Sequence, residues 1–226
     1  MGWLSSAWNA VKGAVRNIFH GIEELVGLII GGITSIFLFW VRKKIRIHVC
    51  ILREKGGKSL ATVGEVEASI ERMNALLKSK YNVKVLMYGA PRIEVVEEIP
   101  PDSALGTQCS ASGYGNIEYG EAGSFFASYA PNIPLVCPVT AFIVQSIKKG
   151  NEQWRGCSSG LLANYVLLTP LGLNDDTTFA HEVGHACNLF HRKKKENLMY
   201  HGADRGTKVT KWQKWWFRAS RHVNYW

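Results

Sequence analysis

Three histidines and one glutamate near the C-terminal end of the chain could form a metal site. His181 and His185 are four residues apart, so on a helix their imidazoles would project from one face at the spacing that a tetrahedral zinc ion needs. Glu182 would lie beside the metal, where its carboxylate could accept a proton from an attacking water. His191 could reach the same ion only if the chain turned sharply, and Asn188 readily adopts the left-handed backbone that such a turn requires. Three histidines with one open coordination position predict a single catalytic Zn²⁺.

This stretch resembles the long zinc motif of the metzincin metallopeptidases, H-E-x-x-H-x-x-G-x-x-H, with Asn188 in place of the usual glycine. The residues Asn197-Leu198-Met199-Tyr200 resemble the methionine turn of that family, in which the methionine lies beneath the histidines. Met199 is followed at once by Tyr200, which is most similar to the matrixin type of turn. The resemblance implies a zinc-dependent endopeptidase that acts on protein or peptide substrates.

The resemblance also implies an α+β zincin fold: a twisted mixed sheet, a backing helix, an active-site helix and a small C-terminal subdomain that ends in a helix. The pattern of the sequence agrees with this layout. Alternating apolar residues predict strands, and helical spacing with capping residues predicts helices. The expected strands are 45–51, 83–88, 139–147 and 164–169. The expected helices begin after Thr62, at Thr177 and after Thr210, and the apolar stripe of the last one includes Val223. Asn174, Asp175 and Asp176 offer capping oxygens for the active-site helix.

A short apolar segment precedes the predicted strand 164–169. It resembles the edge strand on which metzincins align an extended substrate by strand addition. The resemblance therefore implies a substrate-binding role for Gly160, Leu161, Leu162 and Ala163. A long irregular stretch from Pro100 to about Pro134 is either functional or a surface insertion without a role.

The first 44 residues differ from the remainder in composition. Residues 1–24 have helical amphipathic spacing, and the uncharged run of 17 residues from Leu25 to Val41 would span roughly 26 Å as a helix. We therefore expect residues 1–44 to anchor the protein in a membrane as a single-pass span, with a buried helix as the alternative. Residues 45–226 would form the catalytic domain, divided into an N-terminal subdomain, 45–191, and a C-terminal subdomain, 192–226.

Two arguments about the orientation of this expected span conflict, and we expect the catalytic domain on the extracytoplasmic side. Five basic residues between 42 and 53, against two before the span, favour a cytoplasmic catalytic domain. The cysteines favour the extracytoplasmic side, because four of the five fall in the catalytic domain and could form two disulfides. These four are Cys109, Cys137, Cys157 and Cys187. The alternative is that all five are buried thiols in a reducing compartment.

The formal net charge of +9 raises the question of nucleic-acid binding. The basic residues occur in separate clusters and no nucleic-acid motif accompanies them, so we expect no nucleic-acid partner. Two other functions remain open. The chain could be a non-catalytic, zinc-containing, membrane-anchored binding protein, in which His201 would be the nearest candidate for a fourth ligand. Alternatively, residues 1–44 could carry a membrane function that the zinc domain regulates.

Overall fold

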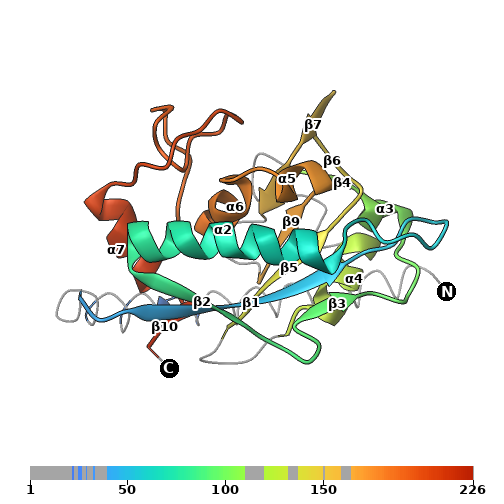
Figure 1. The fold of residues 1–226 in the computed structure, drawn as a ribbon, viewed down its shortest axis with the longest axis horizontal. Helices are drawn as coiled ribbons and strands as arrows, with labels where there is room; N and C mark the ends of the chain where they lie inside the picture. Colours follow the sequence, from blue (N-terminus) through green and yellow to red (C-terminus); the bar gives the residue numbers. More distant parts are fainter. Residues whose placement is uncertain are drawn as a thin grey trace.

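The central element of the fold is the strand β1 (Lys43–Ile51), which lies in the middle of a seven-stranded mixed sheet (Figure 1). The computed structural model describes residues 22, 25, 26, 29, 33, 40–109, 120–131, 137–149, 151–158 and 164–225. Successive side chains of β1 point to opposite faces of the sheet, and both faces of the strand are covered. Ile45, Ile47, Val49 and Ile51 belong to one apolar cluster, whereas Cys50 and Leu52 belong to another.

Both edges of β1 are paired. The parallel strands β2 (Val83–Met87) and β3 (Ile93–Val95) lie along one edge. The other edge pairs with the parallel strand β5 (Val139–Ile143) and the antiparallel strand β10 (Val223–Asn224). The sheet then continues from β5 to the parallel β9 (Tyr165–Leu168) and to the antiparallel β8 (Gly156–Ser158). A separate three-stranded sheet contains β4 (Gly106–Gln108), β6 (Ser146–Lys149) and β7 (Glu152–Trp154).

Helices cover both faces of the main sheet. The backing helix α2 (Val63–Tyr81) begins with the predicted capping box between Thr62 and Glu65. It packs with α6 (Thr178–Ala186) on the face of Ile45 and Ile47 (Figure 1). The short α5 (Pro170–Leu173) precedes α6, and α7 (Lys211–Ala219) follows it in the chain. The opposite face is covered by α3 (Asp102–Leu105) and α4 (Glu121–Tyr129).

These elements confirm the predicted α+β fold class with a twisted mixed sheet, a backing helix, an active-site helix and a helix near the C-terminus. Two boundaries differ from the prediction. The expected strand 139–147 divides at Val144, where the chain leaves the main sheet and β6 begins a second one. Val223, expected on the last helix, instead pairs with Ile45 in β10, because α7 ends at Ala219. Hydrophobic periodicity alone does not show where a strand divides or where a helix ends.

The prediction of a single-pass membrane protein is wrong. Among the described residues, no helix combines the length and the apolar composition needed to cross a bilayer. The predicted run was already marginal, because 17 helical residues reach only roughly 26 Å. Trp40 and Val41, its expected end, form a turn that leads into β1. Most of residues 1–39, including most of the predicted amphipathic helix and span, lies outside the described residues.

One of the two predicted disulfides is present. Cys109 and Cys157 are joined, with their Cα atoms 6.0 Å apart, and connect β8 to the end of β4. Cys50, Cys137 and Cys187 are buried thiols. Within the described part of the chain, the expected second pairing is therefore not formed.

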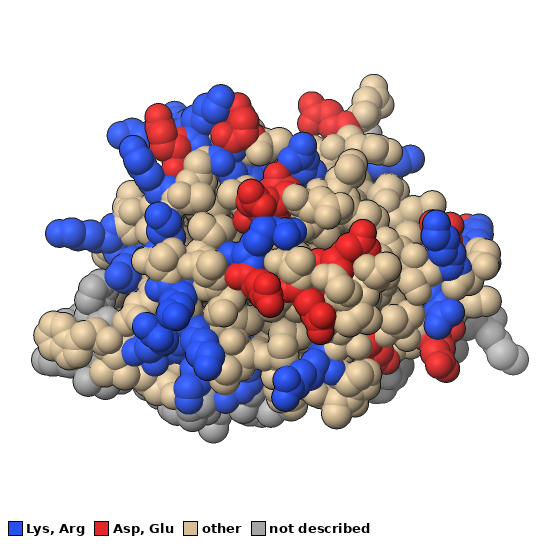
Figure 2. Space-filling model, in the orientation of Figure 1, with Lys and Arg blue, Asp and Glu red and all other residues tan. Residues whose placement is uncertain are grey.

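Charged side chains are mixed on the surface. Figure 2 shows acidic residues across the centre of one face, with lysines and arginines around and among them. On this face the net positive charge is thus distributed over several groups of residues.

Candidate metal centre

The helix α6 is capped by Asp175 from outside its first turn. One carboxylate oxygen, Oδ1, accepts hydrogen bonds from the backbone N–H groups of Thr177 and Thr178, at 3.0 and 2.7 Å, and from both threonine hydroxyls. The burial of Asp175 opposes its ionisation, but these four hydrogen bonds outweigh it and lower its pKa to about 2. A fixed negative charge therefore lies at the positive end of the helix dipole, where it stabilises α6.

The three predicted histidines meet at one point. His185 Nε2 lies 3.1 Å from His181 Nε2 and 3.1 Å from His191 Nε2. His181 and His185 are on consecutive turns of α6, as their spacing predicts. Asn188 has φ of 70°, so the predicted left-handed residue turns the chain after the helix and returns His191 to the cluster.

Backbone carbonyls fix the orientation of two of the imidazoles. His181 Nδ1 lies 2.8 Å from the carbonyl oxygen of Leu198, and His185 Nδ1 lies 2.7 Å from that of Leu189. A carbonyl only accepts, so each Nδ1 carries the proton and each Nε2 of a neutral ring presents a lone pair. Two lone pairs facing each other at 3.1 Å repel, and a cation between them removes this repulsion.

The distances fit a metal ion. Two nitrogens bound at about 2.0–2.1 Å to one tetrahedral zinc ion lie roughly 3.3 Å apart, close to the 3.1 Å between these Nε2 atoms. Burial lowers the pKa of His181 well below its usual value, and the adjacent His185 and Arg205 add to this effect. Burial, with the neighbouring His191, lowers the pKa of His185 to about 4. Both imidazoles are therefore neutral at pH 7, as metal ligands must be.

Met199 lies directly beneath α6. A Cβ atom on Gly184 would be 2.7 Å from Met199 Sδ, so the absence of a side chain there admits the buried thioether. Asn197 Oδ1 accepts a hydrogen bond from the Met199 N–H at 2.9 Å, and the Asn197 side chain also bonds to Gln213 of α7. The turn is thus anchored to the last helix, and its Leu198 carbonyl in turn orients His181.

Comparisons with known proteins give a similarity of fold but no match of sequence. No family model and no curated protein matches the sequence. Among solved structures, the fold is similar to the crystal structure of metalloproteinase-II from Bacteroides fragilis, with 17% sequence identity and a TM-score of 0.45. The match covers 74% of this chain and 48% of that chain, so this chain spans about half the length of that protein.

The side chain of Glu182 projects from α6 toward β8. Its side chain lies against Gly156, where a Cβ atom would be 2.7 Å from Glu182 Cγ and 2.8 Å from Oε1. Only 5% of Glu182 is exposed, and this burial raises the pKa of its carboxyl group to about 8, although the positive Arg205 opposes the shift. A carboxyl group whose pKa lies near neutrality is suited to accept and release a proton.

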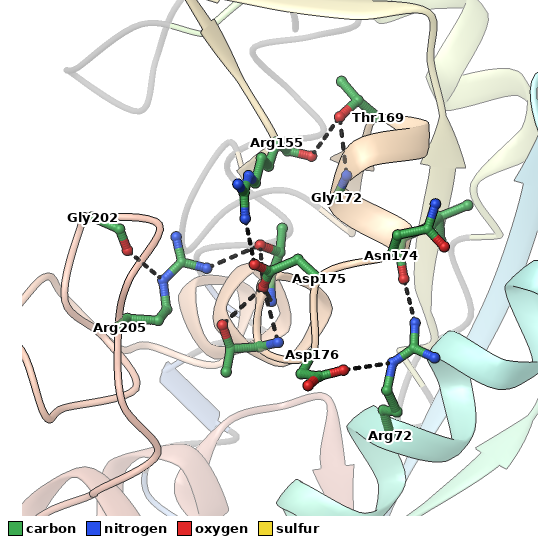
Figure 3. A network of polar contacts seen from close by, with 12 residues as sticks. Arg72, Arg155, Thr169, Gly172, Asn174, Asp175, Asp176, Gly202 and Arg205 are labelled. Carbon is green, nitrogen blue, oxygen red and sulfur yellow. Dashed lines mark hydrogen bonds and ion pairs between the residues drawn. The ribbon is translucent and has the colours of Figure 1, made fainter.

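A polar network joins the two sides of the site (Figure 3). Asp175, which caps α6, accepts a 2.6 Å hydrogen bond from Arg155, next to β8. Thr178, which donates to Asp175, accepts a 3.1 Å hydrogen bond from Arg205, which also donates to the carbonyls of Tyr200 and Gly202. The start of α6 is thereby connected both to β8 and to the loop after Met199.

The structure brings the three predicted histidines together and places Glu182, Asn188 and Met199 on or next to α6, whereas the sequence did not single out Gly156, Arg155 or Arg205. No local motif marks these residues, since their roles depend on segments that fold against α6. Tyr200, predicted near the site, is half-buried with its ring centroid 4.4 Å from that of His201. The predicted substrate-binding residues, Gly160, Leu161, Leu162 and Ala163, lie outside the described residues.

Proposed function

We propose that this protein is a zinc-dependent endopeptidase. The observation that carries the proposal is that the Nε2 atoms of His181, His185 and His191 converge. In two of these rings the other nitrogen, Nδ1, contacts a backbone carbonyl oxygen. This arrangement is suited to zinc because each neutral imidazole offers one lone pair to the same point. The donors are all nitrogen, which fits a catalytic zinc better than a calcium or magnesium ion, since those prefer oxygen.

A bound zinc ion would lower the pKa of water and polarise the scissile carbonyl. Glu182 would act as the general base: its carboxylate would accept the proton of the attacking water and transfer it to the departing amine. The packing of Glu182 against Gly156 supports this role, because it holds the carboxylate in one place on the helix that also carries His181 and His185. Arg155, Asp175 and Arg205 would position the helix that carries these groups.

The substrate would bind as an extended peptide beside β8. This strand ends the order of the main sheet in the described part of the chain, and it pairs with β9 along one edge. A peptide could pair with the other edge by strand addition, with its backbone held near Glu182. The proposed substrate-binding strand is therefore Gly156–Ser158, which precedes the predicted segment Gly160–Ala163 by one intervening residue.

An open coordination position favours the enzyme over the binding protein. In the described segments, the group of metal-ligating atoms around His181 contains three residues, and His201 does not belong to it. The ring centroid of His201 lies 6.3 Å from that of His191. With ligands from the described residues alone, a bound zinc ion would keep its fourth position for water and for a substrate carbonyl.

The proposal is tested by measuring zinc content and peptide-library cleavage for the full chain and for three variants. Glu182→Gln should keep the zinc content of the wild type while cleavage falls at least about 100-fold, because general-base catalysis typically contributes this much or more. His185→Ala should lose both one equivalent of zinc and cleavage. Glu67→Gln, an exposed glutamate on α2, is the matched control and should behave as the wild type. Retention of most activity by Glu182→Gln would exclude the assigned base, and absence of cleavage in all four proteins would exclude the peptidase.

A further inference from the structure

A second group of metal-ligating side chains lies on the opposite face of the main sheet. His48 and Cys50 are two residues apart on β1, so they share the face that does not contact α6. Glu94, on the neighbouring β3, is the register partner of Cys50. One ligand atom from each of the three residues lies within 4.8 Å of the other two. This group is separate from the histidine cluster because the sheet lies between them.

The environment of His48 fixes its ring. Its Nδ1 lies 3.2 Å from the carbonyl oxygen of Tyr88. The chain passes close to the ring at Gly89, where a Cβ atom would be 2.9 Å from the same nitrogen. Since the carbonyl can only accept, Nδ1 carries the proton, and Nε2 is directed toward Glu94 Oε2 at 3.4 Å.

A cation between these two atoms would stabilise the contact. An imidazole that carries its proton on Nδ1 has a lone pair on Nε2, which faces the oxygen lone pairs of Glu94. Either a proton or a metal ion can occupy the space between the two atoms. Cys50 favours the metal ion, since its sulfur lies within 4.8 Å of the other two ligand atoms and adds a third donor that a proton would not use.

We propose that His48, Cys50 and Glu94 form a second zinc-binding site. A nitrogen and an oxygen bound to one tetrahedral zinc at about 2.0–2.2 Å lie roughly 3.4 Å apart, which matches the observed separation of Nε2 and Oε2. Thiolate, imidazole and carboxylate are all common zinc ligands, and the thiolate disfavours calcium and magnesium. The ion would replace the thiol proton of Cys50, which is released to water, and the thiolate and carboxylate would balance its two positive charges.

Burial and access are consistent with this site. Cys50 is fully buried and 6% of His48 is exposed, whereas the Glu94 side chain is 34% exposed and leaves a route for the ion. Burial raises the pKa of the Cys50 thiol, and the nearby Glu94 adds to this effect, so the metal-free chain keeps the thiol protonated. The bound ion would join β1 to β3 and leave a fourth position for water.

Cobalt absorption tests the site in the full-length protein. A thiolate bound to Co²⁺ gives charge-transfer absorption in the near ultraviolet, which histidine ligands alone do not give. We expect the wild type to bind two equivalents of Co²⁺ and to show this band. His185→Ala, which disrupts only the histidine cluster, should lose one equivalent and keep the band. This outcome is independent of whether the protein is a peptidase.

The variants at the second site make the test decisive. Cys50→Ala should lose the band and one equivalent of Co²⁺. Glu94→Gln, at a partly exposed position, should weaken binding at this site at least about 10-fold. Cys137→Ala, which removes another buried thiol, is the matched control and should keep the band. A wild-type protein that binds Co²⁺ without the band, or a band that survives in Cys50→Ala, would overturn the proposal and leave His48 and Glu94 as an ion pair.

Discussion

The carboxylate of Glu182 rests on the backbone of Gly156, which comes from a different element and lies 26 positions earlier in the chain. A methyl group at Gly156 would be 2.7 Å from Glu182 Cγ and 3.0 Å from Cδ. Both atoms are buried, so the carboxylate could not remain in place. The location of the proposed base therefore depends on a residue that has no side chain.

Gly156→Ala should separate catalysis from metal binding. We expect at least a 10-fold loss of peptide cleavage, because Glu182 must move. The zinc content should not change, because the three atoms nearest to the added methyl group all belong to Glu182. Gly64→Ala is the control: a Cβ atom at this first-turn position of α2 would have no neighbour within 4 Å. Equal activity of the two alanine variants would show that Glu182 does not need its present position.

The stability of the metal-free protein should reveal the titration of Glu182. Its pKa of about 8 exceeds the ordinary value of 4.5. Between these values the folded chain keeps a proton that the unfolded chain has released, so the stability from this group falls as pH rises. The free energy of unfolding of the wild type, relative to Glu182→Gln, should decrease by roughly 3 kcal/mol from pH 5 to pH 8.

Urea unfolding of both proteins in the presence of a chelator measures this difference. The histidine shifts are common to the two proteins and cancel in the subtraction, provided that the exchange leaves the cluster intact. A relative stability that stays constant over this pH range would mean that Glu182 is ionised in the folded state.

Met199 should contribute to stability through its volume. It is fully buried and its sulfur occupies the space that Gly184 leaves open. Met199→Ala should reduce the free energy of unfolding by about 2–5 kcal/mol, whereas Met199→Leu should cost less than about 1.5 kcal/mol. Thermal and urea unfolding check the values. Similar losses in both variants would indicate that the thioether itself, and not its volume, supports α6.

Asp175 should be far more important than the adjacent Asp176. Asp175→Ala removes the cap of α6 and leaves Arg155 without this partner, so we expect a loss of about 2–4 kcal/mol and weaker cleavage. Asp176 forms a 3.3 Å ion pair with Arg72, but its side chain is 83% exposed, so Asp176→Ala should cost less than about 1 kcal/mol. Chemical denaturation measures both. Comparable losses would contradict the capping role of Asp175.

Much of the histidine cluster could be predicted from local sequence, because its decisive features are local. The spacing of His181 and His185 places them on one side of any helix, and Asn188 provides the left-handed turn that its small polar side chain permits. The alternation in β1 and the capping box at Thr62 are likewise properties of short segments. The apolar run before residue 42 led to the wrong prediction of a membrane span, because its composition suits a bilayer but its length is marginal.

The sequence by itself therefore determined the identity and helical spacing of the three histidines, the adjacent glutamate and the α+β class. Tertiary structure alone decided that Gly156 supports Glu182, that Cys109 pairs with Cys157, and that Glu94 meets His48 and Cys50. The physical reason is that strand order and register join residues far apart in the chain. Helical spacing is set within a few residues, whereas a contact across the sheet exists only after its strands have paired.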